Sequence, residues 1–202
     1  FAGIATPPSG SLHEEATIAT IAPFMPVFNN LVIYEQHQPL NNTESIVPEL
    51  ATEWQWSEDG KALTFMLREG VKWHDGKPFT SADVKCTWDL LTEKTEDRLR
   101  KNLRKTWYEN LEEVTVDGDY KVTFHLGRPQ PSLLNMLAAG ISPVYPCHRT
   151  AAEMRNQPIG TGPFKFVETR QNQYVKLVKN EDYWKEGLPY LDGIEFNIMR
   201  DR

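Results

Sequence analysis

The most regular pattern of hydrophobic and polar positions lies between residues 48 and 84. Trp54 and Trp56 alternate with polar neighbours, and apolar residues recur at every second position from Leu63 to Leu67. Alternation with a period of two is typical of strands that have one buried face. An Asp-Gly pair lies between the two runs and favours a tight turn, because glycine tolerates positive φ. These residues are therefore predicted to form a β-hairpin.

A helix is predicted soon after this hairpin. After a second Asp-Gly turn comes Thr80, a good N-cap residue, and Asp83 stands three residues later, as in a capping box. Val84, Trp88 and Leu91 then recur at i, i+4 and i+7, which is the spacing of one apolar helix face.

Further strands are predicted in the second half of the chain. The alternation at residues 114–126 predicts another hairpin across an Asp-Gly turn, and residues 164–178 predict two longer strands. Residues 194–198 predict a last strand, which would be an unpaired sheet edge. We therefore expect that more protein normally follows residue 202.

The other helical predictions rest on weaker patterns. Residues 24–34 are predicted to be helical after Pro26, and a second helix is predicted to begin at Pro131, with leucines on its apolar face. The charged run at residues 96–110 is predicted to be the solvated face of a helix.

Composition limits the classes of function. The chain has 202 residues, of which 40% are hydrophobic, enough for one large domain or two small ones. The formal net charge of −6 disfavours nucleic-acid binding, which needs a basic surface. No apolar run approaches the roughly 20 residues that a membrane span requires, and no signal peptide is visible.

The two cysteines, Cys86 and Cys147, lack the spacing of a metal site. Two free thiols are expected, because a chain of this length does not need a covalent staple. A disulfide between them is the alternative.

No catalytic residue, metal ligand or cofactor is predicted. His74 and Asp75 are sequence neighbours, so their side chains should diverge rather than form a catalytic pair. Residues 160–162 lack the lysine of a phosphate-binding loop, and Pro163 removes a backbone donor there, so a strand-entry turn is predicted. The acidic pair Glu14–Glu15 is predicted to lie in a solvated turn. The five histidines have no metal-binding spacing.

A series of spaced motifs runs through most of the chain. The motifs are Pro-Glu-Leu-Ala at 48–51, Asp-Gly at 59–60, Gly-Val-Lys-Trp-His-Asp-Gly at 70–76, Pro-Phe-Thr at 78–80, Pro-Ile-Gly-Thr-Gly-Pro-Phe at 158–164, Asp-Tyr-Trp at 182–184 and Pro-Tyr-Leu-Asp at 189–192. This series resembles the extracytoplasmic solute-binding proteins of ABC importers, in the oligopeptide, dipeptide and nickel-binding family (family 5).

The resemblance implies an α/β (mixed α+β) fold of the class II periplasmic-binding-protein type. Its first lobe is expected at residues 1–35 and 150–202, with an inserted α+β domain at residues 36–149 that carries the family signature. The second lobe is expected to be absent from this chain.

The resemblance also implies a solute-contacting surface. In peptide-binding relatives the first lobe contacts the ligand after its first strand, which, counted back from the predicted helix at Val27–Tyr34, falls at Ile18, Ala19 and Thr20. The alternative is that these three are core or strand residues. Arg100 is expected to be a contact from the inserted domain, where its guanidinium could meet a carboxylate.

The function implied is solute binding without catalysis. The expected partners are an oligopeptide or similar small solute and a membrane permease, with the protein a monomer in the periplasm or anchored outside the membrane. An enzyme on a similar scaffold, for example a hydrolase using His74 or a metal-dependent enzyme, is the alternative. A further alternative is the same fold binding nickel complexes, sugars or opines.

Overall fold

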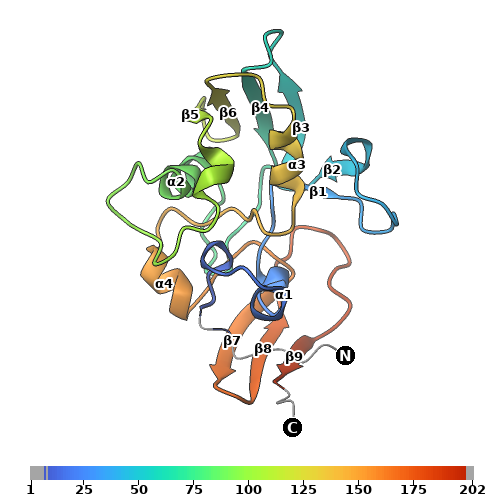
Figure 1. The fold of residues 1–202 in the computed structure, drawn as a ribbon. Coiled ribbons are helices and arrows are strands. Elements are labelled where there is room, and N and C mark those ends of the chain that lie inside the picture. Colours follow the sequence, from blue (N-terminus) through green and yellow to red (C-terminus); the bar gives the residue numbers. More distant parts are fainter. Residues whose placement is uncertain (1–6, 8, 199–202) are drawn as a thin grey trace.

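The computed structural model describes residue 7 and residues 9–198, which form three antiparallel sheets with short helices between them (Figure 1). The α-helices are α1 Ile18–Ile21, α2 Ser81–Leu91, α3 Ser132–Ala138 and α4 Ala151–Asn156. The 3-10 helices are η1 Leu12–Glu14, η2 Met25–Val27, η3 Thr43–Ser45 and η4 Lys105–Tyr108. The strands are β1 Val32–Tyr34, β2 Ile46–Pro48, β3 Ala51–Trp56, β4 Ala62–Leu67, β5 Leu111–Val116, β6 Lys121–Leu126, β7 Phe164–Arg170, β8 Tyr174–Lys179 and β9 Gly193–Asn197. The fold is mixed α/β, as the sequence predicts.

The largest sheet has the strand order β3-β4-β6-β5, and its two hairpins confirm those predicted from the Asp-Gly turns. The predicted helix α2 begins with a capping box formed by Thr80 and Asp83 and packs on β5 and β6. Its Trp88 meets Phe124 edge-on at 5.0 Å between ring centroids, and Phe124 meets Phe65 at 5.6 Å. Burying each such ring contributes on the order of 1.5–3 kcal/mol, so this aromatic cluster holds the helix on the sheet.

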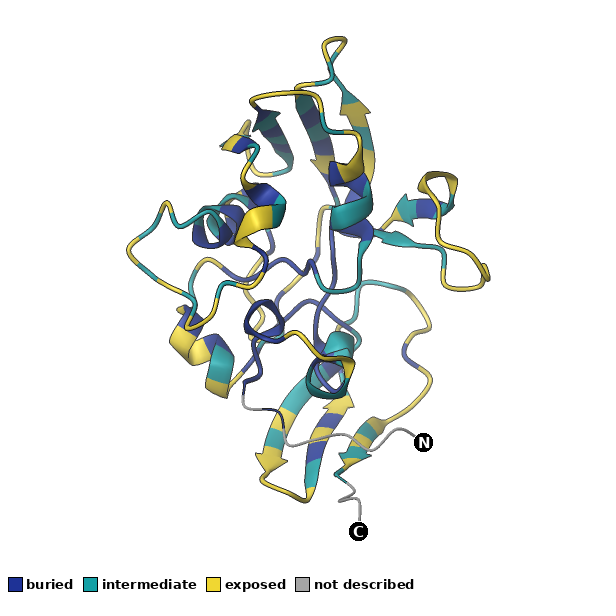
Figure 2. Ribbon diagram, viewed as in Figure 1, coloured by how far each residue is buried: buried dark blue, intermediate teal, exposed yellow. Residues whose placement is uncertain are grey.

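The opposite face of this sheet is open to solvent in the described part of the chain (Figure 2). Gln55 and Met66 are exposed there, while their neighbours along each strand are buried or half-buried. The hydroxyl groups of Thr64 and Thr123 hydrogen-bond across the strands at 2.9 Å. The sheet therefore has one apolar and one solvated face, as antiparallel sheets often do.

The second sheet, at the other end of the molecule, has the strand order β7-β8-β9 (Figure 1). Val175 and Leu177 on β8 are buried and belong to a core with Phe24 and Phe28 from the segment around η2. Among the described residues β9 pairs only with β8, so it is an edge strand as predicted.

The buried apolar residues form two separate hydrophobic cores. One core contains buried residues between Leu31 and Val144, and the other contains buried residues from Leu12 to Phe28 and from Tyr145 to Leu177. The predicted division into a discontinuous first lobe and an inserted domain at residues 36–149 stays a prediction.

Two helical predictions are wrong. Residues 24–34 form only the short η2 before β1, because Val32, Ile33 and Tyr34 favour an extended conformation and pair with β2. The charged run at residues 96–110 contains a 3-10 turn, η4, and no α-helix. Like charges four residues apart in this run, such as Arg100 and Arg104, repel each other on a helix face.

The expectation of two free thiols is also wrong, because Cys86 on α2 and Cys147 form a disulfide with a Cα–Cα distance of 5.5 Å. That distance suits a disulfide. Chain length was the wrong criterion, because the redox compartment also decides whether cysteines pair. The residues between Pro143 and Cys147, which we call the strap, are held against α2 by this bond.

Candidate functional site

The predicted solute-contacting residues Ile18, Ala19 and Thr20 lie on α1 at the surface. Ile18 is 65% exposed and the other two are half-buried, so they are neither core nor strand residues. Arg100 is exposed in the loop between α2 and η4. The helix predicted at Val27–Tyr34, from which the positions of these three residues were counted, is not formed. Their position at the surface is the remaining support for a contact role, which stays a prediction.

The structure brings α1 and the Arg100 loop to the same acidic pair. The backbone N–H of Arg100 donates to Oε1 of Glu14 at 2.6 Å. Burial raises the pKa of the neighbouring Glu15 carboxyl, outweighing the opposing effects of the Thr20 hydroxyl and of the positive charges on Arg100 and Lys101. We call the surface formed by this acidic pair, α1 and Arg100 the α1 site.

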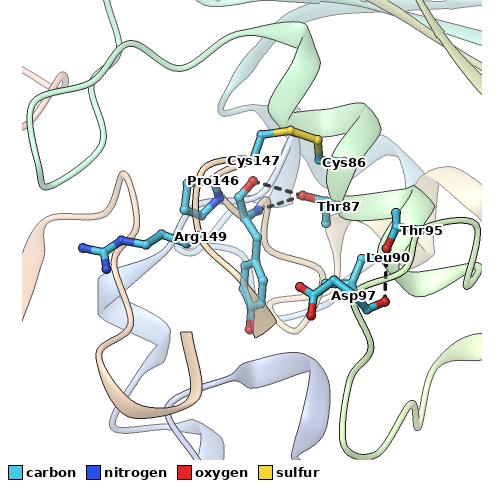
Figure 3. A pocket seen from close by; sticks show the side chains of 9 residues that line it. Cys86, Thr87, Leu90, Thr95, Asp97, Pro146, Cys147 and Arg149 are labelled. Atoms are coloured by element: carbon cyan, nitrogen blue, oxygen red, sulfur yellow. Dashed lines mark hydrogen bonds between the residues drawn. A yellow bond between two sulfur atoms is a disulfide. The ribbon is translucent and has the colours of Figure 1, made fainter. Parts of the chain in front are cut away.

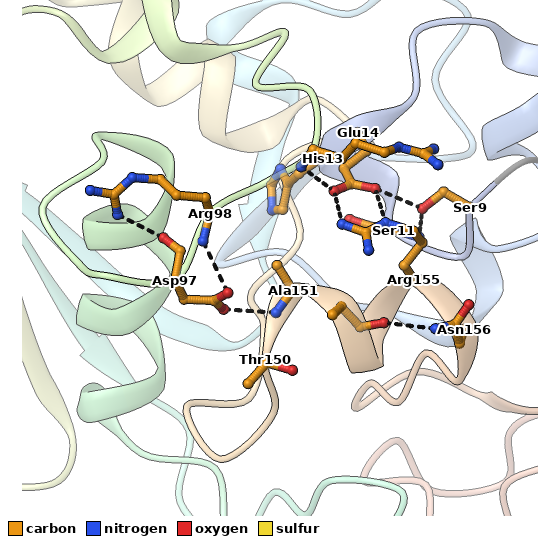
Figure 4. Close-up of polar contacts among 12 residues, drawn as sticks. Ser9, Ser11, His13, Glu14, Asp97, Arg98, Thr150, Ala151, Arg155 and Asn156 are labelled. Carbon is orange, nitrogen blue, oxygen red and sulfur yellow. Dashed lines mark hydrogen bonds and ion pairs between the residues drawn. The ribbon is translucent and has the colours of Figure 1, made fainter.

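Glu14 is the centre of the polar contacts beneath the α1 site (Figure 4). Its carboxylate accepts hydrogen bonds from Nε and Nη2 of Arg155 at 2.9 and 2.8 Å and from the Ser9 hydroxyl at 3.1 Å. Burial opposes ionisation, but the hydrogen bonds from Arg155 and the Arg100 amide, with the Arg155 charge, lower the pKa of Glu14. The predicted solvated turn is wrong for both acids, since Glu14 is 1% and Glu15 is 9% exposed; at Glu14, Arg155 arrives from α4 and replaces water.

Tyr145 of the strap anchors the start of this segment. Its hydroxyl hydrogen-bonds with the Ser11 hydroxyl at 3.1 Å and accepts from the backbone N–H of His13 at 3.3 Å. The His13 ring donates from Nε2 to the carbonyl of Pro143 at 2.9 Å. Burial raises the pKa of Tyr145 to about 12, and burial with the Arg104 charge lowers that of His13 to about 3. Both side chains are therefore neutral near pH 7.

Arg104 fixes the segment from a third direction. Its guanidinium donates to the carbonyl oxygens of Leu12 at 2.8 Å and Glu15 at 2.9 Å, and only 4% of the residue is exposed. Burial lowers the pKa of Arg104. Because backbone carbonyls receive this cation, η1 is held at both of its ends, and α1 begins after residues 15–17.

The chemistry of the α1 site suits binding rather than reaction. It offers an exposed apolar side chain at Ile18, a hydroxyl on half-buried Thr20 and a guanidinium at Arg100, beside the buried carboxyl of Glu15. These groups can form hydrogen bonds and ion pairs with a polar solute. No serine, cysteine or lysine among these residues lies beside a histidine base, as nucleophilic catalysis needs.

His74, the residue of the enzyme alternative, has a structural role. Its Nδ1 accepts from the backbone N–H of Gly160 at 3.2 Å, and its Nε2 donates to the carbonyl of Gly162 at 2.9 Å. Burial lowers its pKa to about 4. Asp75 pairs with His148 at 2.7 Å instead, so the adjacent His and Asp do diverge as predicted.

The loop that His74 holds is also no phosphate site. A Cβ at Gly160 would lie 2.0 Å from the carbonyl oxygen of Val27, and one at Gly162 would lie 2.5 Å from that of Pro26. The glycines therefore allow two backbone segments to touch at the entry to β7, the turn that the sequence predicts.

No group of three or more potential metal ligands occurs among the residues that the structure describes. None of the helices in the same part of the chain combines the length and apolar character that a membrane crossing requires.

Sequence patterns gave no signal for Glu14, Arg104, Tyr145 and Arg155. Each takes part in pairs separated by about a hundred residues or more, and no short-range spacing encodes such a contact. The one signal in the sequence was the density of charged residues at 96–110, which include Arg104.

Comparison with known proteins identifies the family of this chain, which the geometry of the site does not. The family model described as bacterial extracellular solute-binding proteins, family 5 (middle), matches residues 45–202, more than half of the chain. The chain belongs to this family. The oligopeptide-binding protein AppA of Bacillus subtilis is 36% identical over 154 residues, covering 71% of this chain and 27% of AppA. The glutathione-binding protein GsiB of Escherichia coli (strain K12) is 33% identical over 156 residues, covering 75% of this chain and 30% of GsiB.

The fold of this family 5 chain agrees with solved structures. AppA of Bacillus subtilis in complex with a nonapeptide superposes with a TM-score of 0.82 and 29% identity, covering 97% of this chain and 38% of that structure. The chain thus has the fold of the periplasmic binding proteins over part of their length, as expected. It spans less than a third of the length of the two curated relatives, which are named as binding proteins and not as enzymes.

Proposed function

We propose that this chain is part of the solute-binding component of an ABC importer. It contributes one side of a cleft that takes up an oligopeptide or a similar small solute outside the cytoplasmic membrane, in the periplasm or anchored to the membrane. The loaded protein delivers the solute to a membrane permease. The observation that carries the proposal is the family match, together with a rigidly held polar surface at the α1 site.

The anchoring of the α1 site fits this role. A surface fixed by Arg104, Arg155 and Tyr145 loses little freedom when a solute arrives, so more of the contact energy appears as affinity. Lobe closure over the solute would complete the contacts, and a solute that binds the closed form better shifts the balance towards it. Peptide backbones can add to strand edges in such sites.

The names of the relatives support peptides as the first solute class to test, because AppA is named for oligopeptides and GsiB for glutathione. Nickel complexes, sugars and opines are the alternatives. We expect a monomer that binds no nucleic acid.

A thermal-shift panel on the full-length protein tests the proposal. Oligopeptides, glutathione, opines, sugars and nickel–histidine complexes are each added, and a solute at 100 times its Kd stabilises the folded state by about 2.7 kcal/mol. The chain of 202 residues is the control and should bind the same solute much more weakly. Equal affinity of the two forms, or turnover of the solute, contradicts the proposal.

Two matched arginine variants test the α1 site. Arg100→Met should weaken solute binding about tenfold or more, since a charged hydrogen bond contributes about 1.5–3 kcal/mol. Arg98→Met is the control, because its guanidinium donates to the carbonyl of its own neighbour Asp97. Equal affinities of the two variants, measured by calorimetry, would remove Arg100 from the site.

His74 separates the enzyme alternative from solute binding. His74→Asn should leave solute affinity unchanged, because both ring nitrogens face the backbone at residues 160–162. Loss of a hydrolytic activity in this variant would favour the enzyme.

A further inference from the structure

The strap is fixed to α2 by the disulfide and by hydrogen bonds, as well as by its buried side chains; Figure 3 shows the disulfide and the contacts of Thr87. Besides the disulfide, the Thr87 hydroxyl accepts from the backbone N–H of Tyr145 at 2.8 Å and lies 3.2 Å from the Tyr145 carbonyl. The backbone N–H of Cys147 donates to Oδ1 of Asp83 at 2.8 Å. The disulfide is therefore the covalent member of a short array of contacts on one face of α2.

The same strap holds the α1 site from its other side. The Tyr145 hydroxyl receives the backbone N–H of His13 and bonds the Ser11 hydroxyl, and the Pro143 carbonyl receives the His13 ring. Thus Cys147 is two residues from the side chain that positions η1, and only residues 15–17 separate η1 from α1.

We propose that the Cys86–Cys147 disulfide is a positioning bond for the α1 site. It fixes the strap on α2, the strap fixes η1 through Tyr145, and η1 sets the position of α1. The effect on solute binding rests on the proposed function, whereas the effect on η1 and α1 does not.

Loss of the bond should act locally rather than unfold the chain. Val144 in the strap is 1% exposed and belongs to the core beneath α2, and Tyr145 is 3% exposed. These side chains keep the strap near α2 after reduction. What is lost is the fixed distance between α2 and the end of the strap.

Reagents can reach the bond in the folded protein. Cys147 is exposed, Cys86 is half-buried, and both line a cavity of ≈ 190 Å³ between the strap and the loop that contains Asp97 (Figure 3). An added dithiol attacks one sulfur as a thiolate and releases the other cysteine as a thiolate. Its second thiol then closes the oxidised reagent and frees the first cysteine, so two electrons and two protons pass to the protein.

Hydrogen exchange of backbone amides tests the proposal on the full-length protein without any solute. After reduction and alkylation, the amides of His13 and Ile21 should exchange at least about tenfold faster, as expected when roughly one hydrogen-bond equivalent of local stability is lost. The amide of Leu67, which donates to the carbonyl of Tyr120 in the large sheet, is the control and should not change.

Two results would overturn the proposal. One is faster exchange at Cys147 and Tyr145 with His13 and Ile21 still protected, which would make the disulfide a staple for the strap alone. The other is a uniform increase that includes Leu67, which would make it a general stabiliser.

The Tyr145→Phe variant tests the same path with the disulfide intact. It removes the hydroxyl that receives the His13 amide, so His13 should exchange faster while the Cys147 amide does not. Unchanged exchange at His13 would break the link between the strap and η1. Once the thermal-shift panel identifies a solute, reduction of the disulfide and the Tyr145→Phe variant should both weaken its binding. If both change hydrogen exchange at His13 but neither changes solute affinity, the result counts against the proposed function and not against the positioning role of the disulfide.

Discussion

The Glu14→Gln variant should strongly destabilise the fold. Glutamine keeps the size of the side chain but removes its charge and replaces one acceptor oxygen with an NH2 group. In the place of Oε1 that group would face Nη2 of Arg155 and the backbone N–H of Arg100, and in the place of Oε2 it would face Nε of Arg155 and the Ser9 hydroxyl; the nitrogens are all donors. At least one buried hydrogen bond is therefore lost and one donor faces another.

The magnitude follows from burial. Breaking a fully buried ion pair costs about 3–5 kcal/mol, because the remaining charge is left without a partner. The Glu14 side chain is fully buried, but that of Arg155 is 20% exposed and keeps some contact with water. We therefore expect the free energy of unfolding to fall by about 3 kcal/mol, the lower end of that range. For a protein of this size this corresponds to a melting temperature lower by about 6–12 °C.

Urea denaturation as a function of pH measures this loss and identifies its cause. The pKa of Glu14 is lowered in the folded state, so its contribution is fully present above the pKa of the unfolded chain and is lost as pH falls through the folded pKa. The difference between wild type and Glu14→Gln should thus be largest near pH 7 and shrink in acid. Glu153→Gln is the control, since glutamine can also complete the capping box of α4. A loss below about 1 kcal/mol, or one equal to that of Glu153→Gln at every pH, would refute the reasoning.

Three further predictions concern other parts of the chain. The pKa of His74 is lowered to about 4 in the folded state, so on acidification this histidine takes up its proton first in the unfolded chain. The free energy of unfolding should therefore fall as pH drops from about 6.5 to 4. The urea midpoint of His74→Asn should fall less steeply over the same range. Gly160→Ala should cost more than about 3 kcal/mol, because its Cβ would meet a backbone oxygen at 2.0 Å, whereas Gly70→Ala, at φ +76° with open space around it, should cost about 1 kcal/mol in thermal unfolding. Replacing Cys86 and Cys147 together with serine should lower the free energy of unfolding by about 1 kcal/mol or less, because the buried Val144 and Tyr145 keep the strap on α2; a loss near the ~4 kcal/mol that closing a loop of 61 residues can contribute, measured by denaturant titration, would contradict this.

The sequence predicts the parts of the fold that depend on neighbours in the chain. The hairpins β3–β4 and β5–β6 follow from alternation and Asp-Gly turns, and α2 follows from Thr80, Asp83 and its apolar face. Each of these signals lies within about ten residues, so the local sequence suffices. The helix predicted at 24–34 failed because its C-terminal half pairs with β2, a contact that the local pattern does not contain.

The contact role of Ile18–Thr20 and Arg100, which the resemblance implies, stays a prediction. The structure places Arg100 beside Glu14 and Thr20 beside Glu15. Glu14 looked like an ordinary surface glutamate, since its partner Arg155 is 141 residues away. The prediction of two free thiols was wrong for a related reason, because the proximity of Cys86 and Cys147 depends on how the strap crosses α2.

The open face of the large sheet has a practical consequence. Gln55 and Met66 are exposed on this face, so replacing one of them with a cysteine that carries a fluorescent dye should leave both cores intact. The sheet lies at the end of the molecule away from α1 (Figure 1). A dye there can serve as a fixed reference point, against which the movement of a second probe on another part of the protein is measured when candidate solutes are added.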